Sequence, residues 1–290
     1  QDVSQDVSQD VSQDVSQDVS QDVSQDVSQD VSQDVSQDDG KVANLPAQDQ
    51  WEGSHQDLYE YLKPKISEEE RCELISGLQQ KLDSTRFVHG ESLFLDQEIL
   101  EMCIDSKSSM LDEWELACLC TCIKNFDWKK DDYIIEIGTN IGQTAVLLAK
   151  ILKTINMQTK IISIDPFSFA AKETYNPKGN YFHYTTLMHQ QDLYGICIPI
   201  TAYSQDISHI FRDKVGLLFV DGSHQYDDVI KDLNHYSELV RVNGYVFVDD
   251  YGIGSYPGVY RAFEEWLATH DNFKVAFKED YFVLAKKISD

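Results

Sequence analysis

Long apolar runs, clustered basic residues and a disulfide pattern are all missing from this sequence. No apolar run approaches the roughly 20 residues that cross a bilayer, so we expect no membrane-spanning segment. Lys and Arg form no cluster, which disfavours nucleic acid and other polyanions as ligands, because grouped cations bind them. Six cysteines in 290 residues do not indicate a disulfide framework.

Three of the cysteines lie close together in a segment, 114–123, that is typical of a buried helix. On a helix Cys118 and Cys122 share a face while Cys120 points elsewhere, so a three-thiolate metal site is geometrically awkward. We therefore expect buried thiols in a reducing compartment. No secretory signal is visible, which favours a cytoplasmic protein, although the chain starts at Gln1 and a lost leader stays open.

Residues 1–36 are a perfect tandem repeat of Gln-Asp-Val-Ser. A period of four is too short for a packed repeat unit, and one Val in four residues cannot build a core. We predict that residues 1–47 form a disordered, low-complexity tail and linker. The first 39 residues hold eleven acids and no base, so residues 40–290 carry a net charge of −15 out of the −26 of the whole chain.

Residues 48–130 are predicted to form a helical cap region on the domain that follows. Ser67 and Glu70 have the spacing of a capping box, which predicts a helix start. Apolar residues then recur three to four positions apart, at Leu74, Ile75, Leu78 and Leu82. A second helix is expected over 111–126. Nothing in this region suggests chemistry of its own.

From residue 131 onward, apolar runs alternate with helical patterns, and residues 131–290 are predicted to form one domain. The expected strands are 133–137, 160–164, 196–201, 215–220 and 245–248, with helices over 144–152, 228–240 and 259–269 and a closing hairpin of 273–277 with 281–285. This alternation predicts an α/β fold, a Rossmann-like, doubly wound and mainly parallel sheet with a C-terminal antiparallel hairpin. The region from Phe167 to Gln191 is left unassigned.

The turn after the first strand reads Glu136-Ile-Gly-Thr-Asn-Ile-Gly142. Its glycines free the backbone to turn tightly and approach a ligand at a helix N-terminus. Asn140 stands where a nicotinamide-binding motif has its second glycine, and no Gly-Lys-Ser/Thr of a phosphate-binding loop is present. Asp165 ends the second strand, where an acid commonly binds ribose hydroxyls. Together the turn and the acid indicate a nucleoside ligand.

Two later strands, 215–220 and 245–248, run directly into carboxylates. Ligands of open α/β sheets bind beyond the carboxyl ends of such buried strands. Asp221, His224, Asp249 and Asp250 are therefore expected to converge on one cleft, where they could hold a divalent cation beside a titratable base. Three further acids are expected only to cap and solvate the next helix, namely Asp227, Asp228 and Asp232.

With these motifs the chain resembles the class I S-adenosylmethionine-dependent methyltransferases over about residues 109–290. The glycine turn and Asp165 match the cofactor signature of that family. The segments 219–226 and 243–250 are similar to those of the branch that includes macrocin O-methyltransferase and related Mg-dependent sugar O-methyltransferases. Asn243-Gly244 replaces the more usual Pro-Gly-Gly, which we expect to alter only the turn.

The resemblance implies a role for each matching residue. Asp221, Asp249 and Asp250 would be the Mg²⁺ ligands, with His224 as the catalytic base beside Asp221. Ser204, in a segment similar to one that contacts adenine, would lie near that ring. The residues implied to bind S-adenosyl-L-methionine are Glu136, Gly138, Thr139, Asn140, Gly142, Asp165, Ser204 and Asp221.

The expected function is methyl transfer from S-adenosylmethionine to a hydroxyl of a small molecule or glycan, with Mg²⁺ assistance. One alternative is an NAD(P)-dependent oxidoreductase on the same architecture, which the missing glycine and the carboxylates disfavour. Another is a non-catalytic nucleoside-binding protein, disfavoured because Asp221, His224 and Asp249 are all present. Nucleic acid and membranes are not expected as partners, while a homo-oligomer and N- or carboxyl-methylation stay open.

Overall fold

The computed structural model describes residues 58–85, 95–107, 111–167, 177–212 and 214–290, which all lie in one compact unit, Ala43–Asp290. The predicted tail and linker, 1–47, lies outside the described residues. None of the helices in the described ranges is long and apolar enough to cross a membrane.

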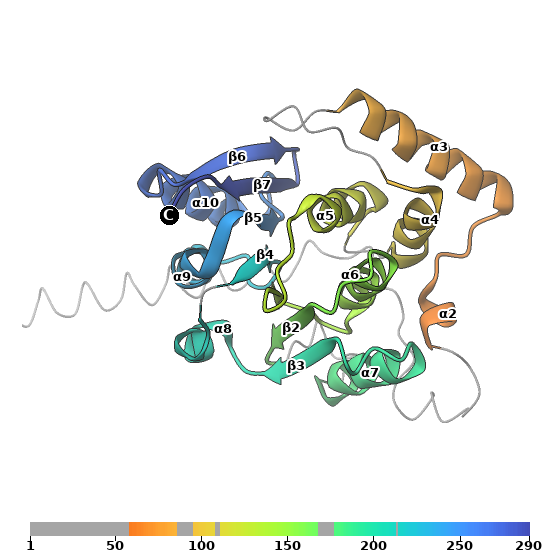
Figure 1. The fold of residues 1–290 in the computed structure, drawn as a ribbon, viewed down its shortest axis with the longest axis horizontal. Coiled ribbons are helices and arrows are strands. Elements are labelled where there is room, and N and C mark those ends of the chain that lie inside the picture. The colour runs from red at the N-terminus through yellow and green to blue at the C-terminus, as the bar shows by residue number, and fades with distance from the viewer. Residues whose placement is uncertain (1–57, 86–94, 108–110, 168–176, 213) are drawn as a thin grey trace, which may run out of the picture. The chain divides into compact units, whose positions relative to one another are not determined.

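A seven-stranded sheet forms the centre of this unit, in the order β3-β2-β1-β4-β5-β7-β6 (Figure 1). Strands β1 to β5 are parallel, while β7 runs antiparallel to β5 and to β6. The predicted Rossmann-like sheet and its closing hairpin are confirmed. The strands are β1 (Tyr133–Ile137), β2 (Lys160–Asp165), β3 (Cys197–Thr201), β4 (Val215–Val220), β5 (Val240–Asp249), β6 (Phe273–Lys278) and β7 (Phe282–Lys287).

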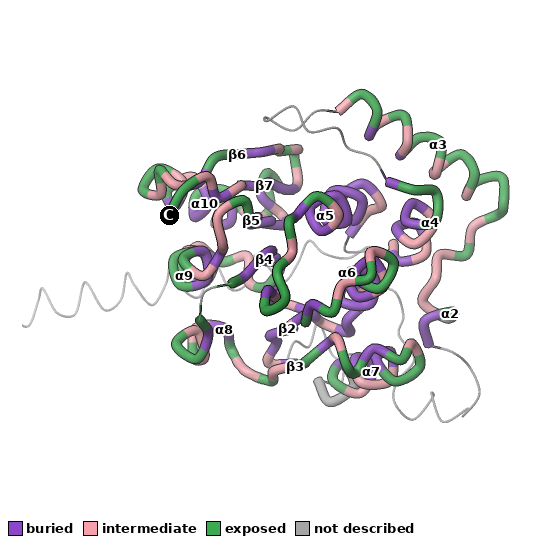
Figure 2. Tube along the Cα trace, viewed as in Figure 1, coloured by how far each residue is buried: buried purple, intermediate pink, exposed green. Residues whose placement is uncertain are grey.

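Helices cover both faces of the sheet, and the buried strand residues divide accordingly (Figures 1 and 2). Ile134 and Phe219 pack in the hydrophobic cluster shared with α4 to α7, whereas Ile135 and Val220 pack in the cluster shared with α9 and α10. This alternation follows from the two-residue period of a strand. The helices are α2 (Leu58–Leu62), α3 (Glu68–Ser84), α4 (Gln97–Ser106), α5 (Glu113–Asn125), α6 (Gln143–Thr154), α7 (Pro177–Gln190), α8 (Ser204–Ile207), α9 (Tyr226–Tyr236) and α10 (Pro257–Thr269).

The helices before β1 begin where side chains cap them. Ser67 and Glu70 form the predicted capping box of α3, since each side chain bonds the other residue's backbone N–H. Asp112 and Glu115 form a second box at the start of α5. The cysteines of α5 are buried, as expected, and α4 and α5 share one hydrophobic cluster with the sheet. A separate cap over 48–130 therefore stays a prediction.

Two parts of the fold differ from the sequence-based expectation. Helix α7 occupies residues 177–190, within the stretch that the sequence analysis left unassigned. Its buried side chains recur at helical spacing, at Asn180, His183, Tyr184, Leu187 and Met188, but polar and aromatic members obscure that pattern. Strand β5 begins at Val240, five residues earlier than predicted, because Asn243 takes a positive φ of 68° within the strand and does not end it.

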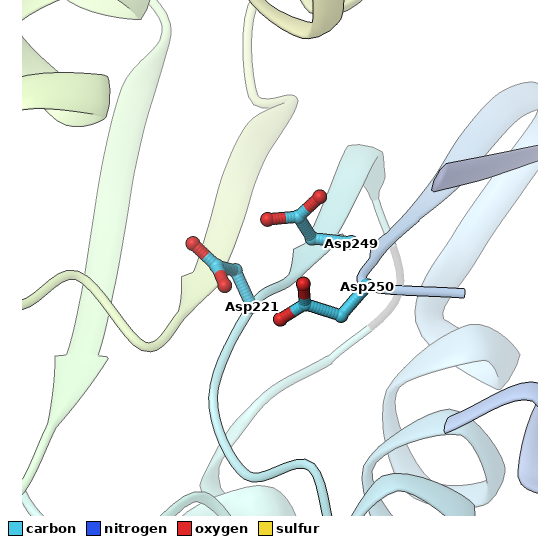
Figure 3. Close-up of side chains that lie close together, drawn as sticks. All are labelled: Asp221, Asp249 and Asp250. Carbon is cyan, nitrogen blue, oxygen red and sulfur yellow. The ribbon is translucent and has the colours of Figure 1, made fainter. Parts of the chain in front are cut away.

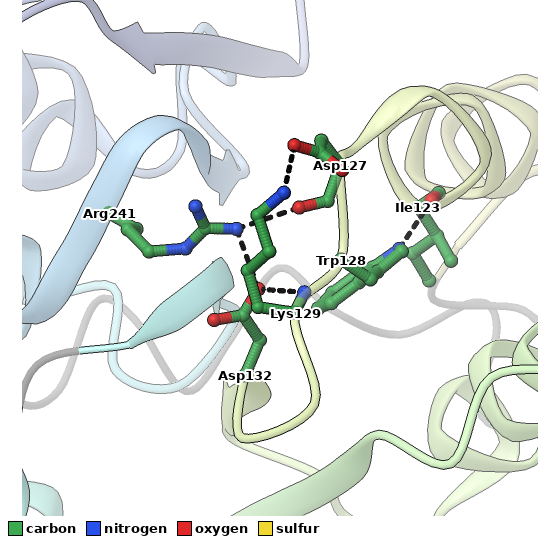
Figure 4. A network of polar contacts seen from close by, with 6 residues as sticks. All are labelled: Ile123, Asp127, Trp128, Lys129, Asp132 and Arg241. Carbon is green, nitrogen blue, oxygen red and sulfur yellow. Dashed lines mark hydrogen bonds and ion pairs between the residues drawn. The ribbon is translucent and has the colours of Figure 1, made fainter.

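A polar network ties the start of β5 to the loop before β1 (Figure 4). Arg241 Nη2 donates to Asp132 Oδ2 at 2.6 Å and to the Asp127 carbonyl oxygen at 2.8 Å. Asp132 Oδ2 also accepts the Lys129 N–H at 2.6 Å, and Trp128 Nε1 donates to the Ile123 carbonyl at 2.7 Å. The Asp132 side chain is only 1% exposed, so its charge depends on these donors.

We expect Arg241→Met to lower the free energy of unfolding by about 2 to 3 kcal/mol, because it leaves the buried Asp132 carboxylate without its cation. Urea denaturation measures the change. The matched control is Lys214→Met, which breaks a 3.5 Å pair with Asp131 between side chains 49% and 70% exposed. That loss should stay below about 0.5 kcal/mol. Equal losses in both variants would contradict the importance of the buried pair.

Candidate active site

The site lies at the carboxyl ends of β1, β4 and β5, where the strand order switches sides between β1 and β4. The turns after β1 and β4 touch there. Gly138 has a φ of +86°, and a Cβ on it would lie 1.9 Å from the Asp221 carbonyl oxygen, so only glycine fits. The Asp221 N–H donates to the Ile137 carbonyl at 2.9 Å. The glycine turn and Asp221 are therefore immediate neighbours.

Asp165 at the end of β2 closes over the glycine turn. Its Oδ2 accepts the Asn140 N–H at 2.8 Å, and its Oδ1 accepts the Phe167 N–H at 2.5 Å. Asn140 has a φ of +50°, and its side-chain oxygen accepts a hydrogen bond from Asn180 Nδ2 at 2.8 Å. Asn180 comes from α7 and was not among the predicted site residues. These contacts hold the turn and the acid as one rigid unit.

Glu136 lies fully buried beneath the turn. Its Oε2 accepts the Ser163 hydroxyl at 2.7 Å, and Tyr184 donates to that hydroxyl in turn at 3.1 Å. Its Oε1 and the Thr139 hydroxyl have no hydrogen-bond partner among the described residues. Burial raises the pKa of Glu136 to about 7, against the opposing effect of the hydrogen bond from the Ser163 hydroxyl. Buried acceptors are rarely left unpaired, so the turn fits a ligand that brings a donor.

Three carboxylates converge beyond β4 and β5, and Figure 3 shows that these side chains lie close together. Asp221, Asp249 and Asp250 each place one oxygen within 4.8 Å of the others. Asp249 is 5% exposed, and its Oδ1 has no hydrogen-bond partner within the described part of the chain. Burial and mutual repulsion raise the pKa values of Asp221 and Asp249. Grouped carboxylate oxygens of this kind fit a hard divalent cation.

A fourth acid, Glu115, reaches the cluster from α5 and was missed by sequence reasoning. It is 4% exposed, and its Oε2 accepts the Asp112 N–H at 2.7 Å. Burial and the adjacent Asp249 carboxylate raise its pKa far above the usual range, so Glu115 keeps its proton and hydrogen-bonds to Asp249. Its capping-box spacing could have located the start of α5, but nothing local indicates that α5 meets β5.

His224 lies beside the cluster, in the loop between β4 and α9. Its Nε2 lies 2.8 Å from Asp250 Oδ2, and its ring stacks on Tyr256 with centroids 3.8 Å apart. Because a carboxylate only accepts hydrogen bonds, Nε2 carries the hydrogen of this pair, and Nδ1 is the ring nitrogen that Asp250 does not engage. The structure thus brings together Asp221, His224, Asp249 and Asp250, as the sequence predicted.

Ser204 follows β3 and directs its hydroxyl into the protein. The hydroxyl donates to Asp232 on α9, and the Ser204 carbonyl accepts the Tyr236 hydroxyl at 2.6 Å. The expectation that Asp232 merely solvates a helix was wrong, because that residue is 2% exposed and lies against α8. Burial raises the pKa of Asp232 to about 7.

Asp232 should make stability depend on pH. Between about pH 4 and pH 7 the unfolded chain loses this proton while the folded chain keeps it, so the free energy of unfolding falls as pH rises. Asp232→Asn retains an acceptor for Ser204 and cannot titrate. Relative to the unaltered chain it should gain up to about 4 kcal/mol across this interval, measured by urea denaturation from pH 4 to 8. If the difference in the free energy of unfolding between Asp232→Asn and the unaltered chain stayed constant from pH 4 to 8, this assignment would be contradicted.

Residues 135–251 match the methyltransferase domain family. The uncharacterized protein R132 of Acanthamoeba polyphaga mimivirus is 34% identical over 131 residues, which cover 43% of this chain and 54% of that protein. The chain thus spans about half the length of that relative.

Two solved structures share the fold. A Corynebacterium glutamicum protein has a TM-score of 0.51 at 14% identity, over 74% of this chain and 97% of its own. The O-methyltransferase NovP has a TM-score of 0.50 at 16% identity, over 76% of this chain and 98% of its own. The matched segment contains the glycine turn, Asp165, His224 and the carboxylate cluster. Residues 135–251 are thus similar to a methyltransferase domain, and the chain has the Rossmann-like fold that these solved structures share.

Proposed function

We propose that this protein transfers a methyl group from S-adenosylmethionine to a hydroxyl of a small molecule or glycan, with help from Mg²⁺. The observation that carries the proposal is the meeting of Asp221, Asp249 and Asp250 with His224, directly beside the glycine turn. A cofactor turn, a cation site and a basic nitrogen at one sheet edge are the parts that such a reaction needs.

The contacts of the glycine turn support the proposal that S-adenosylmethionine binds there. Glu136 and Thr139 offer buried oxygens that have no hydrogen-bond partner in the described part of the chain, and these oxygens suit the ammonium and hydroxyl groups of an amino acid and ribose. Among the described residues, Asp165 accepts hydrogen bonds only from backbone N–H groups, and lone pairs remain for ribose hydroxyls. When bound, S-adenosylmethionine supplies a methyl group on a positively charged sulfur. The turn lies directly beside Asp221, so Glu136, Thr139 and Asp165 would hold the cofactor next to the carboxylate cluster.

The geometry of the carboxylate cluster supports the proposal that Mg²⁺ binds there. Asp221, Asp249 and Asp250 would hold Mg²⁺, and the unpartnered Asp249 Oδ1 would gain a partner. When bound, the cation supplies a Lewis acid that lowers the pKa of an acceptor hydroxyl. Burial and the Asp249 carboxylate raise the pKa of Glu115, which favours its protonated form, and its side chain hydrogen-bonds to Asp249. The cation would also relieve the repulsion among the three aspartates.

The position of His224 supports the proposal that it acts as the catalytic base. Nε2 is engaged by Asp250, so the proton of the acceptor hydroxyl would be taken at Nδ1. Imidazole suits this role because it can exchange protons near neutral pH. A hydroxyl acceptor is favoured over an amine because oxygen acceptors of high pKa need both a cation and a base. The net charge of −15 on residues 40–290 favours neutral or cationic acceptors over polyanions.

The cofactor is tested first, by calorimetric titration of the chain with S-adenosylhomocysteine, with and without Mg²⁺, and separately with NAD⁺. We expect micromolar binding of S-adenosylhomocysteine and none of NAD⁺, because Asn140 occupies the place of the second glycine of a dinucleotide site. Binding of NAD⁺ alone would favour the oxidoreductase alternative. Binding of S-adenosylhomocysteine with no turnover of any hydroxyl acceptor would favour a non-catalytic nucleoside-binding protein.

Replacement of His224 tests the base, with a hydroxyl acceptor obtained from a compound screen. His224→Ala should lower turnover by about 100-fold or more and leave S-adenosylhomocysteine affinity nearly unchanged. His224→Gln is the matched variant, because its amide can still donate to Asp250 but cannot take a proton. Loss of turnover in both variants supports a base. Turnover retained in the Gln variant would restrict His224 to positioning Asp250.

A further inference from the structure

The start of α10 packs directly on the loop that carries His224. Tyr256, the residue before α10, stacks on the imidazole with centroids 3.8 Å apart and planes inclined by 29°. Tyr256 is only partly buried, at the margin of the cluster formed by α9, α10 and the sheet. Its ring therefore covers His224 at the edge of the site.

Gly258 brings the backbone of α10 against the same loop. A Cβ at Gly258 would lie 2.7 Å from the His224 carbonyl oxygen and 2.7 Å from the Tyr226 nitrogen, closer than real Cβ atoms approach. Its φ is not in the left-handed region, so close approach alone explains the glycine. The first turn of α10 thus packs against the backbone of the His224 loop and limits where that backbone can lie.

A third contact holds the far end of the loop. The Tyr226 hydroxyl donates to Glu265 at 2.5 Å, and the Arg261 guanidinium lies 4.3 Å from the centre of the Tyr226 ring. Arg261 and Glu265 are themselves paired at 2.8 Å on α10. The loop that begins after β4 is therefore fixed by α10 at the ring, at the backbone and at its C-terminal end.

These contacts reach the carboxylate cluster through one hydrogen bond. His224 Nε2 donates to Asp250 Oδ2, and Asp250 has a φ of +57°, so its side chain leaves the strand end in an unusual direction. A hydrogen bond fixes one atom of an imidazole, and a stacked ring fixes its plane. With both in place, the orientation of His224 and of the Asp250 carboxylate is determined together.

We propose that Tyr256 and Gly258 are positioning residues, which hold His224 against Asp250 and thereby keep Asp250 oriented for a divalent cation. This inference rests on the proposed function, since it assumes a cation at the cluster. Both residues lie outside the matched segment 135–251, so the family match does not include them. Partners one step removed from a metal commonly change metal affinity by about 10- to 100-fold.

The test measures Mn²⁺ binding to the full chain, with Mn²⁺ as the probe and electron paramagnetic resonance of the free ion as the readout. Tyr256→Phe keeps the ring and should leave affinity within about twofold, whereas Tyr256→Ala should weaken it by about 10-fold. Tyr256→Leu, which keeps apolar bulk without a flat ring, should resemble Ala and serves if the Ala variant does not fold. Gly258→Ala should also weaken binding.

A double mutant separates positioning from general damage. In a His224→Ala background, Tyr256→Ala should change Mn²⁺ affinity by less than about twofold, because its effect passes through His224. The control is Tyr194→Ala, which removes a tyrosine beside His189 (centroids 6.0 Å apart) just before β3, at the opposite edge of the sheet. It should leave affinity unchanged.

Two failures are distinguishable. If the unaltered chain binds no Mn²⁺ although it binds S-adenosylhomocysteine, the proposed function loses its metal and this inference falls with it. If the unaltered chain binds Mn²⁺ and Tyr256→Ala binds it equally well, the inference alone is overturned. If Tyr256→Ala lowered Mn²⁺ affinity equally in the presence and absence of the His224 side chain, the inference would also be overturned. The effect of the Tyr256 ring would then not pass through His224.

Discussion

The crowding of negative charge at the ends of β4 and β5 is the constraint on which the rest of this structure depends. Asp221, Asp249 and Asp250 would repel one another in a partly dehydrated setting, and such an arrangement costs free energy unless it is compensated. The pKa of Glu115 is raised by this crowding, which favours its protonated form. The His224 Nε2–H donates a hydrogen bond to Asp250, which offsets part of the negative charge. A bound cation would complete the compensation. A fold maintains unfavourable electrostatics of this kind where they serve a site.

The surrounding elements hold that cluster in place from several directions. Parallel strands bring the carboxyl ends of β1, β4 and β5 to one edge, and the contact of Gly138 with the Asp221 backbone closes the gap between two of them. Helix α5 supplies Glu115 from one face of the sheet, and α10 supplies Tyr256 and Gly258 from the other. The segment 135–251, which matches a methyltransferase domain, contains the glycine turn and the three aspartates, while Glu115, Tyr256 and Gly258 lie outside it.

Much of the site was predictable because its signals are local. Apolar runs that end in acids mark strand ends, and strand ends of a parallel sheet meet; this alone indicates that Asp221 and Asp249 lie close together. Glu115 and Asn180 carried no such signal, since each reaches the site across a helix packing that no short segment encodes. Asp232 shows the opposite error: an acid in a helix is expected to face water, but the approach of α8 buried it against Ser204.

By itself the sequence determined the alternation of strands and helices, the tight glycine turn and the acids at the strand ends, because these follow from side-chain periodicity and backbone sterics within a few residues. Only the tertiary structure decided which nitrogen of His224 is engaged, that Glu115 lies against Asp249, and that Tyr256 covers the imidazole. Those features depend on how elements far apart in the chain pack, and on the dehydration that the packing causes. Neither the packing nor the dehydration can be derived from a short stretch of residues.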